Sequence, residues 1–410
     1  MKYIEKLLNG AEVKWMPLGE VCDFKNGFAF KSYLFKETGL PVIRISNING
    51  KSVDMSDIKY FDVQDYHGKG NPLDYCIEKG DVLIAMSGAT TGKIGYYDNE
   101  EKVYQNQRVG KFVPNNNILD GRFLYHFLQT KTQYLYNLAG GGAQPNLSTN
   151  DIKEKVLIPI PPLAVQEEIT RILDKFTTLE AELEAELDCR KRQYEYYRNQ
   201  LLSLDVINNK GHLNHVEVVT LGEIGTFVRG SGLQKKDFTP TGVGCIHYGQ
   251  IYTYYGTCAD KTKSFVSYEF AQKARKAKTG DLIIATTSEN DDDVCKAVVW
   301  LGDDEIAVSS DACFYTHKMN PKYVAYYFQT DSFQKQKRSF ITGTKVRRVN
   351  ATDLAKIKIP IPPLAEQQRI VSILDKFEAL TTSISEGLPK EIALRRKQYE
   401  YYRNQLLSFA

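Results

Sequence analysis

The chain has 410 residues, of which 42% are hydrophobic and 25% are charged. This composition is typical of a folded protein with two or three domains, and it excludes the disordered and collagen-like classes. Its 53 basic and 50 acidic residues leave a formal net charge of only +3, unlike a strongly basic nucleic-acid binder. Any DNA-binding surface must therefore be local.

The sequence carries no export or membrane signal. The first residues, MKYIEKLLNG, lack the apolar core of a signal peptide, and apolar runs such as Val82 to Met86 are far shorter than the ~20 residues of a membrane span. The seven cysteines form no C-x-x-C pair, which is typical of reduced thiols. We expect a cytoplasmic protein with no membrane partner.

An internal repeat organises the chain. IPIPPLA occurs at 158–164 and 359–365, and each copy is followed by a glutamine (Gln166, Gln367), by ILDKF at 172–176 and 373–377, and by QYEYYRNQLLS at 193–203 and 398–408. Runs of this length do not recur by chance. We therefore predict a first variable domain at 1–157, a central repeat helix at 158–205, a second variable domain at 206–358 and a C-terminal repeat helix at 359–410.

The two variable domains resemble each other only faintly. LGE occurs at 18–20 and 221–223, and GDVLIA from Gly80 corresponds to GDLIIA from Gly280. Each segment has about 150 residues, a normal size for one domain. We expect an α+β fold in which two mixed α/β domains are separated by two long antiparallel coiled-coil helices, with a pseudo-two-fold internal duplication.

Apolar residues in the repeats recur at the three-and-four spacing of an amphipathic helix. The prolines place the helix starts near Leu163 and Leu364, and Gly387-Leu388-Pro389 predicts a break before a further helix at 393–407. A first helix of about 60 Å needs a partner, and the second copy is the nearest one. The alternative is that both are core helices of a larger globule. The expected helix or partner-subunit interface comprises Ile169, Phe176, Leu183, Tyr194, Tyr197, Ile370, Phe377, Tyr399 and Tyr402.

Catalytic motifs are missing. The segment at 71–74, NPLD, lacks the second proline and aromatic residue of an adenine methyltransferase loop, and GATTGKI at 88–94 departs from a phosphate-binding loop. His212 and His215 lack a third metal ligand nearby, and Asp291 to Asp293 are interpreted as a solvated loop. We expect a binding protein with no catalytic residues, no metal site and no cofactor of its own.

Loops that mix basic side chains with amides and hydroxyls are the candidate DNA contacts, since these groups bind phosphates and base edges. In the first domain they are Lys25, Asn26, Arg44, Asn47, Ser87, Thr90, Thr91, Lys93, Gln105, Gln107, Arg108, Gln144 and Asn146. In the second they are Arg229, Ser231, Gln234, Lys235, Lys236, His247, Tyr248, Gln250, Thr286, Thr287, Ser288, Lys345, Arg347 and Arg348.

NLS at 146–148, then IPIPPLAVQEEITRILDKF and RKRQYEYYRNQLL, resemble the junction between a target-recognition domain and the central repeat in specificity subunits of type I restriction-modification enzymes. The C-terminal copy resembles the distal repeat of that family, and the likeness covers the whole chain. The resemblance implies that each domain reads one half of a bipartite, asymmetric site in double-stranded DNA. It also implies that helix length sets the gap between half-sites, which would give the tandem EAELEAEL at 180–187 a function.

The resemblance further implies the partners of this chain. Two methyltransferase subunits would supply S-adenosylmethionine chemistry, and two restriction subunits would use ATP and Mg²⁺. The competing interpretation is a coiled-coil scaffold whose domains bind other proteins rather than DNA.

Overall fold

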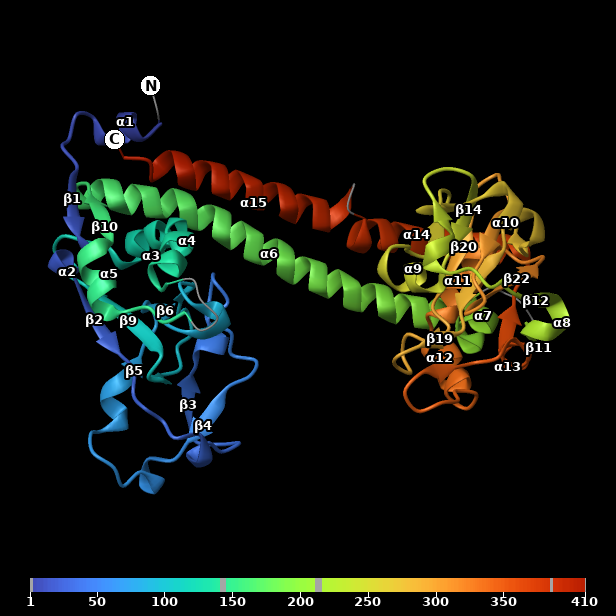
Figure 1. Ribbon diagram of the computed structural model, residues 1–410, viewed down its shortest axis with the longest axis horizontal. Coiled ribbons are helices and arrows are strands. Elements are labelled where there is room, and N and C mark those ends of the chain that lie inside the picture. Colours follow the sequence, from blue (N-terminus) through green and yellow to red (C-terminus); the bar gives the residue numbers. More distant parts are fainter. Residues whose placement is uncertain (1–2, 141–144, 211–215, 384–385, 410) are drawn as a thin grey trace. The chain divides into compact units, whose positions relative to one another are not determined.

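The computed structural model describes residues 3–140, 145–210, 216–383 and 386–409 (Figure 1). The chain divides into two compact units: unit 1 is Met1–Glu182 with Ile392–Ala410, and unit 2 is Leu183–Glu391. Unit 1 thus combines the first variable segment with the start of the first repeat and the end of the second. Unit 2 combines the second variable segment with the end of the first repeat and the start of the second.

Unit 1 is built on two four-stranded sheets and a two-stranded one. The first four-stranded sheet has the order β2-β9-β6-β7, the second has the order β4-β3-β8-β5, and β1 pairs with β10. The strands are β1 (Lys14–Pro17), β2 (Cys22–Asn26), β3 (Leu40–Ile43), β4 (Lys59–Phe61), β5 (Cys76–Ile77), β6 (Val82–Ala85), β7 (Ile94–Tyr96), β8 (Val103–Gln105), β9 (Val109–Pro114) and β10 (Leu157–Ile160). The short helices are α1 (Tyr3–Leu8), α2 (Leu18–Val21), α3 (Gly121–Thr130), α4 (Thr132–Leu138) and α5 (Thr149–Lys155).

Unit 2 has two five-stranded sheets, ordered β12-β22-β18-β20-β15 and β13-β16-β14-β21-β17, with β11 paired to β24 and β19 to β23. The strands are β11 (Glu217–Thr220), β12 (Gly225–Arg229), β13 (Phe238–Thr239), β14 (Val243–Ile246), β15 (Cys258–Ala259), β16 (Ser264–Val266), β17 (Lys276–Ala277), β18 (Leu282–Ala285), β19 (Thr287–Ser288), β20 (Ala297–Trp300), β21 (Ile306–Val308), β22 (Ala312–His317), β23 (Arg347–Arg348) and β24 (Lys358–Ile361). The short helices are α7 (Leu204–Lys210), α8 (Leu221–Ile224), α9 (Tyr248–Thr253), α10 (Tyr268–Lys273), α11 (Pro321–Phe328), α12 (Asp331–Arg338) and α13 (Ala351–Leu354).

The central strand of each unit explains the repeated GD-x-x-I-A pattern. All four residues of β6 are buried, because side chains on both of its faces enter a core. Val82 and Ile84 pack in the core that contains α3, whereas Leu83 and Ala85 pack in the core of the second sheet. Strand β18 in unit 2 is buried in the same alternating way. A continuous apolar run is therefore required in both units.

The repeat segments form long helices that begin where the prolines predict. Helix α6 (Leu163–Leu201) is continuous, and α14 (Leu364–Thr382) and α15 (Gly387–Leu406) form the second copy. The predicted break is present, but its position differs: α14 ends before Gly387-Leu388-Pro389, and these residues form the first turn of α15. Proline is tolerated there because first-turn N–H groups have no partner within the helix. The mixed α+β fold with a long helix between two domains is confirmed.

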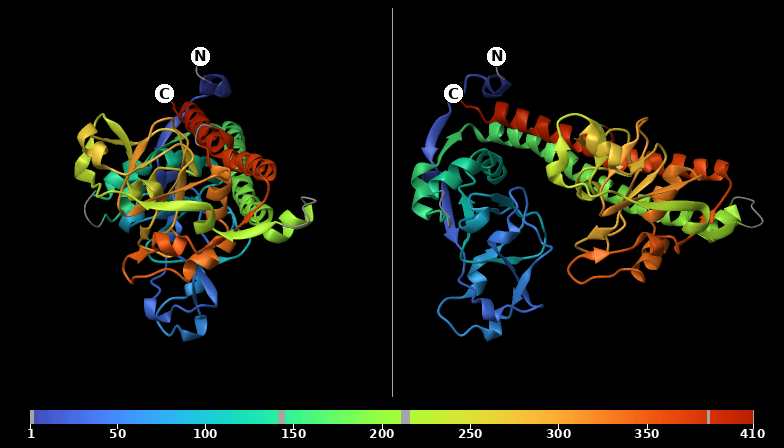
Figure 2. Two further views of the ribbon diagram at one scale, coloured as in Figure 1. Left: turned by 90° about the vertical axis from the view of Figure 1, so that its right-hand side faces the viewer. Right: turned by 45° about the vertical axis from the view of Figure 1, so that its right-hand side comes forward.

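Within each unit, one repeat helix packs against the other copy. In unit 1, α15 runs beside the first part of α6 (Figures 1 and 2), where Phe176 stacks on Tyr402 and Glu180 contacts Arg396 at 2.5 Å. As residue numbers rise along α6 they fall along α15, so this pair is antiparallel. In unit 2, Phe377 of α14 stacks on Tyr194 and Tyr197 of α6.

Within the described part of the chain, none of the helices combines the length and the apolarity that a membrane span requires.

Candidate nucleic-acid interface

The candidate DNA loops of unit 1 converge on one turn, at 106–108. This turn joins β8 of one sheet to β9 of the other. Asn26, at the end of β2, pairs with Gly110, and Ala85, at the end of β6, pairs with Val109. Ile43, at the end of β3, pairs with β8 at Gln105. The loops that follow β2, β3 and β6 therefore all emerge beside the turn.

Hydrogen bonds hold these loops of unit 1 together. Nη1 of Arg108 donates to Oδ1 of Asn146 at 3.0 Å, and Ser87 forms a β-bridge with the same asparagine. Oδ1 of Asn26 accepts a 3.0 Å hydrogen bond from the hydroxyl of Thr149. We call the group formed by Lys25, Asn26, Ser87, Arg108 and Asn146 the unit 1 polar cluster.

Unit 2 repeats this construction around its own turn, at 309–311. Arg229, at the end of β12, pairs with Cys313, and Ala285, at the end of β18, pairs with Ala312. Nε of Arg229 donates to the carbonyl oxygen of Ser310 at 2.9 Å. The loops after β12 and β18 therefore emerge together, as their counterparts do in unit 1.

Two further segments join the turn of unit 2. The backbone N–H of Tyr248 donates to the hydroxyl of Ser309 at 2.8 Å, and Ser231 forms a β-bridge with Ser309. Strand β19 after β18 pairs with β23, so that Thr287 lies opposite Arg348. The equivalent pair in unit 1 is Ser87 and Asn146. We call the group formed by Arg229, Ser231, Tyr248, Thr286, Ser288, Arg347 and Arg348 the unit 2 polar cluster.

The structure separates the predicted contact residues by exposure. Those exposed are Lys25, Asn26, Gln107, Arg108, Asn146, Arg229, Gln234, Lys235, Lys236, Lys345 and Arg348. Those half-buried are Arg44, Ser87, Thr90, Lys93, Ser231, His247, Tyr248, Thr286, Ser288 and Arg347. Those buried are Asn47, Thr91, Gln105, Gln250 and Thr287. Gln144 lies outside the described residues, as do His212 and His215.

The buried members hold the loops instead of facing solvent. Nε2 of Gln105, which is 1% exposed, donates to the backbone oxygens of Lys25 and Val109 at 2.7 and 2.6 Å. Nδ2 of Asn47 donates to the backbone oxygens of Asp54 and Asp57. Such side chains satisfy buried backbone groups. Because these five residues are buried, they are left out of the proposed contact set.

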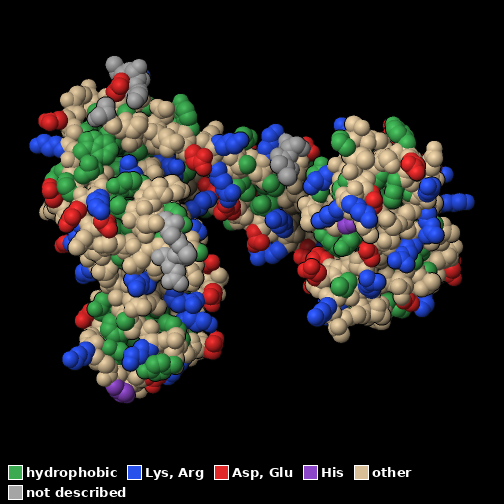
Figure 3. All heavy atoms as spheres, in the orientation of Figure 1, with side chains coloured by type: hydrophobic (Ala, Val, Ile, Leu, Met, Phe, Trp, Pro, Cys, Tyr) green, Lys and Arg blue, Asp and Glu red, His purple; other side chains and the backbone are tan. Residues whose placement is uncertain are grey.

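Several basic side chains are paired with acids. Nη2 of Arg44 lies 2.9 Å from Oδ2 of Asp57, and Nε of Arg347 lies 2.8 Å from Oδ1 of Asp291. All three aspartates of the 291–293 run are exposed, as expected, but Asp291 is engaged with the polar cluster. Charged side chains of both signs are spread over the visible surface (Figure 3), in keeping with the small net charge.

His247 lies at the edge of the unit 2 polar cluster. Burial lowers the pKa of its imidazole, and the charge of Lys235 lowers it further, while Asp311 opposes the shift. The imidazole is therefore neutral near pH 7. Its Nδ1 accepts a 3.2 Å hydrogen bond from the backbone N–H of Gly249, so the neutral ring carries its proton on Nε2 and can donate it to a base edge without adding positive charge.

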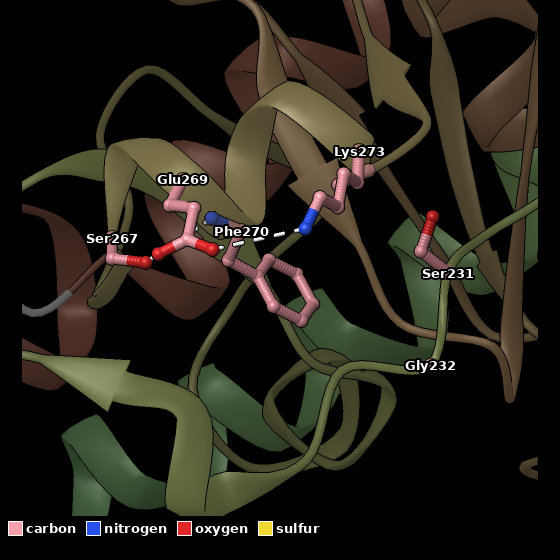
Figure 4. A pocket seen from close by; sticks show the side chains of 7 residues that line it. Ser231, Gly232, Ser267, Glu269, Phe270 and Lys273 are labelled. Carbon is pink, nitrogen blue, oxygen red and sulfur yellow. Dashed lines mark hydrogen bonds and ion pairs between the residues drawn. The ribbon is translucent and has the colours of Figure 1, made fainter.

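A pocket of about 450 Å³ opens beside Ser231 (Figure 4). Ser267, Phe270 and an ion pair between Glu269 and Lys273, 3.7 Å apart, form its wall. The paired charges give it no net attraction for an anion. Among the described residues no group of His, Cys, Asp and Glu has the arrangement of a metal site.

The sequence reasoning missed the role of two buried glutamines. Oε1 of Gln166 accepts from the backbone N–H of Asp120 at 2.9 Å, and Nε2 donates to the carbonyl oxygen of Pro161. Gln367 makes the same two bonds in unit 2, to Asn320 and Pro362. Both amides join the start of a repeat helix to the domain. Their recurrence after each IPIPPLA block was the available signal.

In each unit, a second set of polar contacts links the domain to the repeat helices. In unit 1, Asp174 lies 2.8 Å from Nε of Arg122 and 2.7 Å from Nε2 of His126, whose Nδ1 lies 3.1 Å from the Tyr399 hydroxyl. Burial alone would raise the pKa of Asp174, but the hydrogen bond from His126 and the charge of Arg122 lower it.

Unit 2 places different residues in the same network. Asp375 corresponds to Asp174 of unit 1 and contacts Nζ of Lys322 at 2.8 Å and the Tyr326 hydroxyl at 2.6 Å. The aspartate occupies the same position in both repeats, whereas the residues of the variable domain that contact it differ between the two units. The repeat therefore provides the same attachment to two diverged domains.

The predicted helix-interface residues differ in burial. Ile169 and Ile370 are fully buried, one in each unit. The remaining members, Phe176, Leu183, Tyr194, Tyr197, Phe377, Tyr399 and Tyr402, range from buried to exposed. Tyr197 and Tyr402 are 43% and 42% exposed although they stack on phenylalanines, so each side chain remains partly accessible to solvent.

Two sheet-based domains with converging polar loops, joined through duplicated helices, define a modular protein built from two equivalent halves. The model of the type I restriction modification DNA specificity domain matches residues 11–188 and 214–394. The chain therefore belongs to the family of type I restriction-modification specificity subunits.

Individual relatives agree with this assignment over the full length. The chain is 32% identical to the EcoR124I/EcoR124II specificity subunit of Escherichia coli, with 100% of this chain and 97% of the relative covered. It is 33% identical to a putative type I restriction enzyme specificity subunit of Haemophilus influenzae, with 100% and 98% covered.

Solved structures share the fold. The specificity subunit of the type I system of M. genitalium is 15% identical, covers 98% of both chains and gives a TM-score of 0.55. A chain from a structural study of complex assembly and conformational transition of the type I system is 17% identical, with 97% of this chain and 98% of that chain covered and a TM-score of 0.58.

Proposed function

We propose that this chain is a non-catalytic DNA reader that recognises a bipartite, asymmetric site and directs methylation and restriction by partner subunits. In this proposal the domains at 1–157 and 206–358 each read one half-site. The observation that carries the proposal is the recurrence of one construction, in which polar loops from two sheets converge on a single turn in both units. A pair of such sites on diverged scaffolds suits a site with two different halves.

The residue chemistry supports DNA as the ligand. Four basic side chains of the clusters are exposed and can neutralise phosphates: Lys25, Arg108, Arg229 and Arg348. The nearby amides and hydroxyls can form hydrogen bonds with base edges. Because the net charge is only +3, affinity would depend on these local groups rather than on the whole molecule. The members of the two polar clusters, all of them exposed or half-buried, are the proposed contact set.

The repeat helices are the proposed binding surface for methyltransferase subunits. Tyr197 and Tyr402 remain partly exposed at equivalent points of the two units. Tyrosine is enriched at protein interfaces because it combines apolar area with a hydroxyl. Two equivalent surfaces suit two methyltransferase subunits. In the complete enzyme those subunits would use S-adenosylmethionine, and two restriction subunits would use ATP and Mg²⁺, so this chain needs no cofactor.

We propose that the length of the helix between the domains sets the number of base pairs between the two half-sites. The EAEL unit at 184–187 is four residues long, about 6 Å of helix, which is nearly two base-pair steps. It lies within the continuous helix α6. Its removal would shorten the helix without touching either polar cluster.

Methylation mapping tests the proposal. This chain is coexpressed with a methyltransferase subunit of its own system, and modified adenines in the host genome are mapped by single-molecule sequencing. We expect a split motif with a fixed gap that requires this chain. Methylation with no motif beyond that of the methyltransferase alone, together with binding that tolerates scrambled DNA, would favour the scaffold interpretation.

A further inference from the structure

Arg347 of the unit 2 polar cluster is held in one orientation by its neighbours. Its side chain is 33% exposed, and Nε lies 2.8 Å from Oδ1 of Asp291. Nη1 donates to the carbonyl oxygen of Gly343 at 2.6 Å. An arginine fixed on two sides loses less conformational entropy when it binds a ligand. The guanidinium is therefore preorganised.

The turn that supplies the Gly343 carbonyl is itself fixed. Thr342 and Arg348 exchange two backbone hydrogen bonds, at 2.9 and 2.8 Å, and close a tight loop around residues 343–347. Gly343 has φ +87°, and a Cβ there would lie 2.1 Å from the Val346 carbonyl oxygen. Only glycine fits this position, because other residues disfavour positive φ and would clash.

The loop that supplies Asp291 is anchored by a buried cation. Lys337 is 0% exposed, and its Nζ donates to the backbone oxygens of Asp292 and Val294 at 3.0 and 2.9 Å. The side chain of Asn290 is bonded to Asp293 within the same loop. A buried lysine is costly unless it is paired, so these bonds hold the acidic loop firmly. The Asp291 carboxylate is consequently a fixed partner for Arg347.

The free donors of Arg347 fit one class of acceptor. Nη2 has no partner among the described residues, and Nη1 keeps a second N–H, so the end of the guanidinium can donate two hydrogen bonds. Bidentate donation from arginine matches O6 and N7 of guanine in the major groove. A phosphate is disfavoured at this point, because the Asp291 carboxylate would repel it and reduces the local positive charge.

We propose that Arg347 reads a guanine in the half-site recognised by unit 2, and that Asp291 and Lys337 are positioning residues for this contact. The inference rests on the proposed function and specifies the base chemistry of one half-site. It gives the 291–293 aspartates a role beyond a solvated loop. A lysine at 347 would keep the charge but lose the two-donor fork.

The test uses the full chain in complex with its methyltransferase subunit and a duplex that carries the mapped motif. Each guanine of the motif is replaced in turn by 7-deazaguanine, which lacks the N7 acceptor. We expect the wild-type complex to lose affinity at one guanine of one half-site. Arg347→Lys and Arg347→Ala should bind the natural duplex about 5- to 150-fold more weakly, the range of one bidentate contact, and should be insensitive to 7-deazaguanine at that position.

Asp291→Asn should reduce discrimination at the same guanine only, whereas Glu289→Gln, an exposed acid of the same loop, should leave it unchanged. The idea is overturned if no guanine distinguishes the wild type from the Arg347 variants. It is also overturned if Arg347→Ala keeps base discrimination while the slope of log K against log salt falls by about 0.9, the signature of a phosphate contact. A wild-type complex with no split motif would instead contradict the proposed function.

Discussion

The ring of Phe176 stacks on Tyr402, with centroids 5.1 Å apart, and the equivalent ring of Phe377 stacks on Tyr197 at 5.5 Å. Each phenylalanine comes from an ILDKF block and each tyrosine from a QYEYY block of the other copy. The two copies are therefore cross-paired: the start of one repeat always meets the end of the other.

Cross-pairing predicts a measurable coupling between Phe176 and Tyr402. In a double-mutant cycle with alanine at both positions, we expect a coupling free energy of about 0.5–1.5 kcal/mol, the usual range for an aromatic pair. Chemical denaturation of the full chain measures it. A parallel cycle between Phe176 and the exposed Tyr401 is the control, and equal coupling in the two cycles would contradict the stacking account.

The buried side-chain amides of Gln166 and Gln367 predict a clear loss of stability when either one is removed. Gln166→Ala should lower the free energy of unfolding by about 1–3 kcal/mol, because the N–H of Asp120 and the carbonyl of Pro161 lose their partner. Gln367→Ala should do the same in unit 2. Gln200→Ala, at an exposed position of α6, is the matched control. Equal stabilities of the three variants would show that the amides are dispensable.

His317 predicts a pH dependence of stability. Burial lowers the pKa of His317 to about 4 in the folded chain, whereas an unfolded histidine titrates near 6.5. The unfolded state therefore binds a proton first as the pH falls, and stability is lost between about pH 6.5 and pH 4. The contribution is at most about 3.5 kcal/mol, since one pKa unit corresponds to about 1.4 kcal/mol.

The difference between the wild type and His317→Asn isolates this contribution. Denaturation midpoints measured from pH 7.5 to pH 4 should converge as the pH falls, because the wild type loses a contribution that the variant lacks. His67→Asn, at an exposed histidine, should keep the wild-type profile. Parallel wild-type and His317→Asn curves would argue against a depressed pKa.

Helix length predicts the gap between half-sites. Deletion of residues 184–187 should preserve both half-site sequences and shorten the preferred gap by one or two base pairs, because about 6 Å of helix is removed. Methylation mapping reads both quantities at once. Altered half-sites with an unchanged gap would contradict the proposal that helix length sets the gap.

The sequence predicts the helices better than the site, for physical reasons. The prolines of IPIPPLA define the starts of α6 and α14 to the residue, because proline cannot sit inside a helix. Glycine and proline at 387–389 indicate an interruption, but helix formation resumes already at Gly387 because a first turn tolerates both residues.

The candidate site is only partly predictable because residue type does not report burial. Gln105 and Arg108 lie three residues apart in one polar segment, yet the glutamine is buried and donates to two backbone carbonyls, whereas the arginine is exposed. The contact between Ser87 and Asn146 joins residues that are 59 positions apart in the sequence. Such neighbours are brought together by backbone pairing in the folded chain, which a list of polar loops does not contain.

The most direct test of the central claim separates the two polar clusters in one methylation map. Complexes that carry Lys25→Ala with Arg108→Ala, or Arg229→Ala with Arg348→Ala, are compared with the wild-type complex. The account predicts that the first pair relaxes or weakens one half of the motif, that the second pair affects the other half, and that the gap stays constant. Changes in both halves from either pair, or in neither half from both pairs, would contradict the claim that each unit reads its own half-site.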